Sequence, residues 1–134
     1  MTKADVEEIV KRYPFVIEAA KAGEKTAAFY IGNRKQIFEI TEGVKAVYAI
    51  LEEIEESERD RDVLCMIDGI KKGRSDVAIM QNVYWQKNAY YERKDRLIDK
   101  IFECCISKGF VRYEEIMNEM YSLWERRERK SMPI

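Results

Sequence analysis

Polar side chains with hydrogen-bonding groups recur along one side of a helix that the sequence predicts from about Gln86. Apolar residues return at helical spacing on its other side, which indicates one buried and one solvent-facing surface. A short helix capped by Ser75 precedes it, after a tight turn. This arrangement is typical of a helix-turn-helix that binds DNA. The polar side carries Lys87, Asn88, Tyr91, Glu92, Asp95 and Arg96, and the apolar side carries Tyr90, Leu97, Ile98, Ile101, Phe102 and Cys105.

The short helix before the turn has its own start and stop signals. The Ser75 hydroxyl can accept a hydrogen bond from a first-turn amide, and Asp76 suits the positive end of the helix dipole. Asn82 tolerates the left-handed conformation that often ends a helix. The apolar side of this predicted helix of about two turns consists of Val77, Ile79, Met80 and Val83.

The composition favours a soluble helical protein with one core. The chain has 134 residues, of which 46% are hydrophobic and 37% charged, and only 6 are glycine and 2 proline. With 24 basic and 25 acidic residues, the net charge is −1. Overall charge therefore gives no support to nucleic-acid binding, and a basic patch must arise locally.

Enzymatic chemistry is disfavoured by the residues that the chain lacks. It has no histidine, the commonest general base and metal ligand, and no phosphate-binding or dinucleotide-binding glycine pattern. Paired carboxylates at Glu52–Glu53 and Glu55–Glu56 are better explained as a solvated helix face than as a catalytic site. We therefore expect no catalytic residues, no metal and no cofactor.

The cysteines and the N-terminus indicate a cytoplasmic location. Cys65, Cys104 and Cys105 are an odd number without zinc-ligand spacing, which favours buried thiols in a reducing compartment. The first residues lack the apolar core of a signal peptide, and no stretch approaches the ~20 apolar residues of a membrane span.

The N-terminal half is predicted as helices joined by one uncertain connection. Thr2 can cap a helix that ends before Pro14, followed by a second piece to Ala22 or by a kinked continuation of the first. Residues 23–34 are interpreted as a connection with an apolar anchor, with a short strand or a helix left open. A long helix is predicted over Arg34–Ser57, with an apolar side of Ile37, Phe38, Ile40, Val44, Val47, Tyr48, Leu51 and Ile54.

Charge changes sign along the middle of the chain. Residues 42–62 contain eight acidic against three basic residues, and residues 71–96 contain seven basic against three acidic ones. The acidic surface is either solvated, which we favour, or contacts a basic partner. The basic stretch is what a DNA-facing surface on a near-neutral protein requires.

Two further helices complete the predicted set. One spans about 58–70, and the last runs over about 112–130 and ends in basic residues that suit either the helix dipole or a phosphate backbone. The apolar stripe of the last helix is Ile116, Met117, Met120, Tyr121 and Trp124.

The stretch from Ser75 to Lys108 resembles the helix-turn-helix of bacteriophage late-gene transcriptional regulators of the ArpU/RinA type, which are similar to the promoter-reading domain of housekeeping sigma factors. The resemblance covers about 44–106 and departs at Met80, where a small residue is usual, and at Tyr84, where glycine is common. It also departs in the recognition helix, which carries the acidic residues Glu92 and Asp95. The residues that carry it are Ser75, Ile79, Val83, Trp85, Gln86, the run Asn88-Ala89-Tyr90-Tyr91-Glu92-Arg93-Lys94 and, upstream, Lys11-Arg12-Tyr13-Pro14.

The resemblance implies roles for individual residues. It places Tyr90, Leu97 and Ile101 in the core, and it implies a phage or prophage source. Asparagine can pair with adenine, lysine can donate to guanine and glutamate can accept from cytosine. The implied base contacts are Lys87, Asn88, Tyr91 and Glu92, and the implied phosphate contacts are Lys72, Arg74, Arg93, Lys94 and Arg96.

Together these observations predict an all-α domain of five to six helices that contains a helix-turn-helix and regulates transcription. Residues 1–57 form a helical region for interaction or dimerisation, residues 58–108 the DNA-binding region, and residues 109–134 a C-terminal helix. The expected partners are double-stranded DNA and either RNA polymerase or a second copy of the chain. The alternative is a helical adaptor or phage assembly or packaging protein. A continuous positive face of Lys72, Arg74, Lys87 and Lys94 would favour the DNA reader.

Overall fold

The computed structural model describes residues 1–112, 114–118, 120–121 and 124–125. These residues are mostly helical, with one two-stranded antiparallel sheet, so the predicted all-α class is only approximate. No helix among them is long and apolar enough to cross a membrane. The elements are α1 (Lys3–Lys11), α2 (Tyr13–Lys21), β1 (Thr26–Ile31), β2 (Arg34–Glu39), α3 (Glu42–Ser57), α4 (Arg61–Lys71), α5 (Asp76–Met80) and α6 (Lys87–Ser107).

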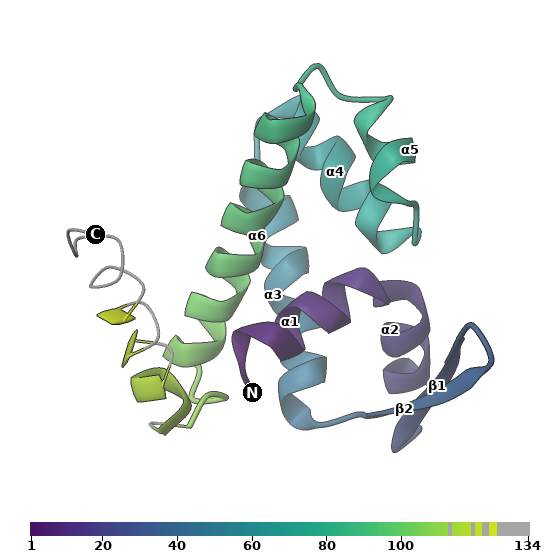
Figure 1. Ribbon diagram of the computed structural model, residues 1–134, viewed down its shortest axis with the longest axis vertical. Coiled ribbons are helices and arrows are strands. Elements are labelled where there is room, and N and C mark those ends of the chain that lie inside the picture. Colours follow the sequence, from purple (N-terminus) through teal and green to yellow (C-terminus); the bar gives the residue numbers. More distant parts are fainter. Residues whose placement is uncertain (113, 119, 122–123, 126–134) are drawn as a thin grey trace, which may run out of the picture.

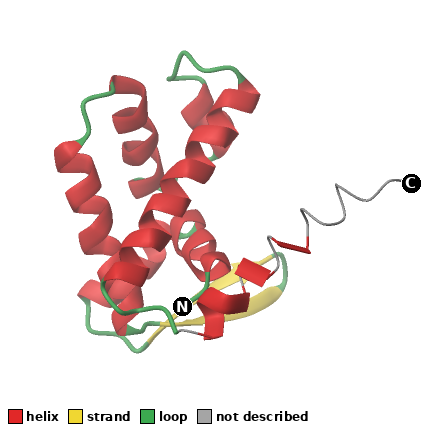
Figure 2. Cartoon of the chain, turned by 90° about the vertical axis from the view of Figure 1, so that its left-hand side faces the viewer, coloured by secondary structure: helices red, strands yellow, loops and turns green. Residues whose placement is uncertain are grey.

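Helices α3 and α6 form the long axis of the molecule and pack against each other (Figure 1). The turn between α5 and α6 lies at one end of this axis, and the β1–β2 hairpin lies at the other end (Figures 1 and 2). The buried core draws on every helix from α1 to α6. It includes all six side chains predicted for the inner side of α6, namely Tyr90, Leu97, Ile98, Ile101, Phe102 and Cys105.

The first helix begins where the sequence predicts, whereas the second begins at Tyr13, two residues before the predicted Phe15. The Thr2 side chain accepts from the Asp5 amide, and the Asp5 carboxylate accepts in turn from the Thr2 amide, which completes a capping box. Pro14 lies in the first turn of α2, where its missing amide hydrogen costs no helical hydrogen bond. The chain therefore breaks at Arg12 into two helices rather than continuing through a kink.

The hairpin corrects the predicted helix over Arg34–Ser57. Residues 34–39 form β2, and α3 begins only at Glu42, with the Thr41 hydroxyl accepting from the Val44 amide at 3.4 Å. Gly32, with a φ of 61°, turns the chain back in a conformation that favours glycine. Ile37, which also fits the helical spacing of α3, points outward and is 68% exposed.

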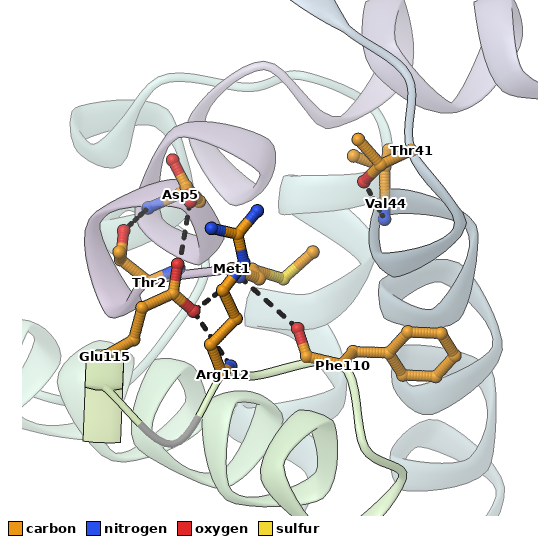
Figure 3. Close-up of polar contacts among 8 residues, drawn as sticks. All are labelled: Met1, Thr2, Asp5, Thr41, Val44, Phe110, Arg112 and Glu115. Atoms are coloured by element: carbon orange, nitrogen blue, oxygen red, sulfur yellow. Dashed lines mark hydrogen bonds and ion pairs between the residues drawn. The ribbon is translucent and has the colours of Figure 1, made fainter. Parts of the chain in front are cut away.

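The segment that follows α6 is fastened to the N-terminus (Figure 3). The terminal amine of Met1 donates to the Phe110 carbonyl at 3.3 Å and to Glu115 Oε2 at 2.7 Å. The Arg112 amide also donates to this carboxylate, at 3.1 Å. The hydrogen bond from the terminal amine is the main cause that lowers the pKa of Glu115, against the opposing effect of burial.

The predicted last helix is helical over 114–118, 120–121 and 124–125. Its predicted basic end, at 126–130, lies outside the described residues. Ile116 packs against the core. The other members of its predicted apolar stripe, Met117, Met120, Tyr121 and Trp124, are exposed instead.

Candidate nucleic-acid interface

The α5–α6 unit (residues 75–107) begins with the cap that the sequence predicts. The Ser75 hydroxyl accepts from the Ala78 amide at 3.2 Å. Ile79 is buried, and its side chain lies so close to Gly69 of α4 that a Cβ there would meet Ile79 Cγ1 at 2.5 Å. Glycine at position 69 therefore allows α5 to pack closely on α4.

The backbone of the connection between α5 and α6, residues 81–86, forms hydrogen bonds with side chains of α4. The Tyr84 amide donates to Asp62 Oδ2 at 3.3 Å, and the Cys65 thiol donates to the Asn82 carbonyl at 3.7 Å. Asn82 does not adopt the predicted left-handed conformation. Its side-chain amide instead donates to the Ala78 carbonyl at 3.1 Å, which ends α5 without a positive φ. The connection is longer than the three to four residues typical of a helix-turn-helix, but its ends are fixed.

A polar clamp joins the start of α5 to the middle of α6. Asp76 Oδ1 accepts from the Tyr90 hydroxyl at 2.6 Å and from the Lys94 ammonium at 2.8 Å. Burial alone would raise the pKa of Asp76, but the hydrogen bonds from Lys94 and Tyr90 outweigh it, and the pKa is lowered. Burial and the hydrogen bond to Asp76 raise the pKa of Tyr90, so its hydroxyl remains a donor. We call these three residues the Asp76 clamp.

The four predicted base-contact residues all lie on the exposed surface of the first two turns of α6. Lys87 and Asn88 are exposed and have no ion pair or side-chain hydrogen bond with any other described residue. The Tyr91 ring packs edge-on against Tyr90 at 5.2 Å between centroids, so one ring is buried and the other remains accessible. Glu92 pairs with Arg96 at 2.8 Å in an exposed i,i+4 contact.

The residues predicted to contact phosphates lie in different environments and do not form one surface. Lys94 is held in the Asp76 clamp with its side chain only 20% exposed, and Lys72 pairs with Asp68 at 3.0 Å. Arg74 is exposed two residues before Asp76. The four cations expected to form one positive face, Lys72, Arg74, Lys87 and Lys94, thus include two that are already paired.

Arg93 and Arg96 lie on another side of α6, beside α3 and α4. Together with Lys100 and the acidic Glu58 they border a groove of about 150 Å³, whose apolar walls come from Ile54, Val63, Met66 and Leu97. The Arg93 guanidinium also lies over the Trp85 ring, 5.3 Å from its centroid, which ties the turn to the helix. Positions 93, 96 and 100 share one helical face.

Two surface residues were missed by the sequence interpretation. Lys100 extends the basic side of α6, and its i+4 spacing from Arg96 could have revealed it. Tyr84 in the connection is 89% exposed, which is unusual for an aromatic residue beside a buried core. The only signal for Tyr84 was a large ring at a position where turns usually carry small or polar residues.

The described residues offer little material for a metal or redox site. No group of three or more carboxylates and thiols within them is placed to hold a metal ion. All three thiols were expected to be buried, but only Cys105 is, and Cys65 and Cys104 are half-buried. Burial raises the pKa of the Cys105 thiol. Comparison of the chain with family models, curated proteins and solved structures finds no match.

Proposed function

We propose that the chain is a sequence-specific DNA-binding transcriptional regulator, phage or prophage encoded, whose α5–α6 unit acts as a helix-turn-helix. The observation that carries this proposal is the pairing of a rigid inner face with a free outer face on α6. Tyr90 is fully buried, whereas Lys87, Asn88 and Tyr91 around it are exposed. A helix that reads bases needs side chains free to hydrogen-bond and a backbone that does not move.

We assign different tasks to residues that the sequence treated alike. Asn88 offers a donor and an acceptor that match adenine in the major groove, and Lys87 offers a donor to guanine. Arg93, Arg96 and Lys100 supply positive charge along one side of α6, where they can neutralise phosphates. Lys94 has its charge engaged by Asp76, so we assign it to positioning α6 against α5.

The test is selection of bound fragments from random duplex DNA, followed by affinity measurements on the selected and on a scrambled duplex. Asn88→Ala is expected to weaken binding to the selected duplex by about 1–3 kcal/mol and to change binding to scrambled DNA little. Asn33→Ala, which removes an exposed amide from the hairpin turn, is the matched control and should change neither. If the wild-type chain binds neither duplex at low salt, the proposal is wrong.

A helical adaptor or phage assembly protein is the second candidate, and two observations favour it. Lys72, Lys94 and Arg96 each form an ion pair within the chain, and large apolar side chains such as Tyr84 and Val77 are exposed on the α5–α6 unit. Exposed apolar groups near a clamped helix suit a protein partner as well as DNA. Failure to enrich any sequence, together with salt-insensitive binding to a protein partner, would support this alternative.

A further inference from the structure

A pocket of about 540 Å³ lies between α2, α3 and the end of α4, and none of its lining residues belongs to the α5–α6 unit. We call it the Tyr13 pocket. Its volume is within the range of small-molecule sites. Along α2 its lining occupies positions 13, 14, 17, 18 and 21, which share one helical face. Its polar lining consists of Tyr13, Glu18, Lys21, Tyr48, Glu52 and Lys71.

The Tyr13 hydroxyl is a polar group of this pocket that the fold leaves without a partner. Tyr13 is only 2% exposed, and its oxygen forms no hydrogen bond with any described residue. Burial, and then the negative charge of Glu52, raises the pKa of Tyr13, so the hydroxyl keeps its proton. Because Glu52 also lines the pocket, the hydroxyl end of the ring faces it. Buried hydroxyls normally have a hydrogen-bond partner, which a molecule bound in this pocket can supply.

The chain itself places an ammonium group on the aromatic wall of the pocket. Lys21 Nζ lies 4.6 Å from the centroid of the Tyr48 ring. This is a cation–π contact, in which the negative face of the ring attracts a positive charge. Lys21 is exposed and forms no ion pair with any described carboxylate, so its flexible side chain can turn to solvent and leave the ring to another cation.

The carboxylates beside the ring also favour a cation. Lys71 is already neutralised, since it donates to Glu52 at 2.6 Å and to Glu55 at 3.1 Å. Two carboxylates against one ammonium leave one excess negative charge in this cluster. The Glu18 carboxylate lines the same pocket and forms no ion pair within the part of the chain that the structure describes. Apart from Lys21, the pocket therefore has a negative surrounding that attracts cations and repels anions.

We propose that the Tyr13 pocket binds a small aliphatic amine, whose ammonium group takes the place of Lys21 on the Tyr48 ring. The N–H groups of such a ligand can donate to the Tyr13 oxygen and to a neighbouring carboxylate. Pro14 and Ile17 supply an apolar lining that suits its alkyl chain. The proposal goes beyond DNA binding and does not depend on it, because the two sites share no residue.

The first experiment compares two probes of opposite charge. The full chain is titrated with butylammonium or with butanoate at constant ionic strength, and the ring resonances of Tyr13 and Tyr48 are followed by NMR. Butylammonium should shift both rings and reach saturation, whereas butanoate, which has the same number of carbon atoms, should leave them unchanged. Absence of a saturable shift with butylammonium, or equal or tighter binding of butanoate, would overturn the proposal.

Removal of Lys21 tests whether the ligand takes its place. Lys21→Gln takes away the competing ammonium and should strengthen butylammonium binding by about threefold or more. Lys25→Gln, which removes an exposed cation outside the pocket, is the matched control and should change the affinity little. Weaker binding to Lys21→Gln would show that Lys21 holds the ligand instead of competing with it, and the proposed exchange would be wrong.

Two tyrosine variants test the contacts one at a time. Tyr48→Leu should weaken butylammonium binding by about fivefold, whereas Tyr48→Phe keeps the ring and should bind like the wild type. Tyr13→Phe should weaken binding by about tenfold, the scale of a hydrogen bond to a charged group. Without the amine, Tyr13→Phe should unfold at the same urea concentration as the wild type or at a higher one, because the deleted hydroxyl has no partner in the fold. A clear loss of stability in Tyr13→Phe, or equal affinity of Tyr48→Leu and Tyr48→Phe, would contradict these contacts.

Discussion

The two ends of α6 expose side chains in opposite ways. At its first turns the exposed groups are mostly polar, and buried or hydrogen-bonded residues lie directly behind them, including Tyr90 and the Asp76 clamp. Beyond its last turn the exposed groups are apolar, and the contacts behind them are Ile116 and the ion pair between Met1 and Glu115. These exposed side chains are Met117, Met120, Tyr121 and Trp124. One end offers hydrogen-bonding groups above a buried layer, while the other carries apolar side chains that are exposed among the residues the structure describes.

The two ends therefore offer two kinds of interaction, directional hydrogen bonds at one end and apolar contacts at the other. Hydrogen bonds to bases depend on direction, so the residues that make them need a fixed backbone. Apolar association has little directional requirement and gains from the area removed from water. The buried and hydrogen-bonded side chains behind the polar end of α6 are therefore what the proposed base contacts require.

The largest expected effect is on the free energy of unfolding. The contrast between the two ends of α6 predicts that this effect is large at one end and small at the other. Tyr90→Ala removes a fully buried ring and one arm of the Asp76 clamp, and should lower the free energy of unfolding by ~3–5 kcal/mol. Tyr121→Ala removes an exposed ring and should change it by less than ~0.5 kcal/mol at concentrations where the chain is monomeric. Urea unfolding of both variants measures the difference, and equal midpoints would show that the assignment of buried and exposed faces is wrong.

Tyr91→Ala should have an effect on stability between those of Tyr90→Ala and Tyr121→Ala. Tyr91 is 38% exposed and contacts Tyr90 only at a ring edge. Tyr91→Ala should destabilise the fold much less than Tyr90→Ala while weakening DNA binding, since Tyr91 is accessible on the side of α6 that carries the proposed base contacts.

A smaller effect concerns the dependence of stability on pH. The Asp76 clamp holds the pKa of Asp76 in the folded chain below its ordinary value of 3.8. Its contribution to stability is therefore fully present above that value and is lost as the pH falls through the lower, folded pKa. Asp76→Asn should unfold more easily than the wild type at pH 6, and the difference should shrink below about pH 4.

Glu115 at the apolar end provides the control for this titration. Its pKa is also lowered, but through the hydrogen bond from the Met1 amine rather than through a contact between helices. Glu115→Gln should show the same direction of pH dependence without moving α5 against α6. Chemical shifts of the Ile79 methyl groups should therefore change in Asp76→Asn and stay constant in Glu115→Gln; equal changes would argue against a clamp specific to α5.

Local signals made several helix ends and the buried side of α6 predictable. The caps at Thr2 and Ser75, the break at Pro14 and the buried side of α6 all depend on residues close in sequence, and all were confirmed. The second strand of the hairpin was missed because Ile37 and Ile40 fit the helical period of α3 as well as a strand, whereas β1 lies within residues 23–34, for which a short strand was left open. Only the Gly32 turn and the Thr41 cap, weak signals on their own, distinguish the two.

The arrangement of the candidate site was less predictable, because it depends on contacts distant in sequence. Exposure of Asn88 and burial of Tyr90 follow from helical geometry. The pairing of Lys94 with Asp76, 18 positions earlier, depends on the angle between two helices, which no local pattern encodes. The sequence consequently treated Lys94 and Arg96 as equivalent cations, although the structure places them in different environments.

The last and smallest effect tests that distinction between Lys94 and Arg96. Arg96 forms an exposed i,i+4 pair with Glu92, so Arg96→Ala should change the free energy of unfolding by less than ~0.5 kcal/mol. If its guanidinium contacts a phosphate, it should weaken binding to selected and scrambled DNA alike and reduce the slope of log affinity against log salt by about one. Lys94→Ala should instead destabilise the fold by about 1–3 kcal/mol, because Asp76 loses its cationic partner. Its slope against salt should remain that of the wild type, since the ammonium is occupied in the free protein. A salt titration of both variants beside their urea unfolding curves decides the matter. A reduced slope with unchanged stability for Lys94→Ala would show that DNA takes Lys94 from the Asp76 clamp, and that the rigid end of α6 rearranges on binding.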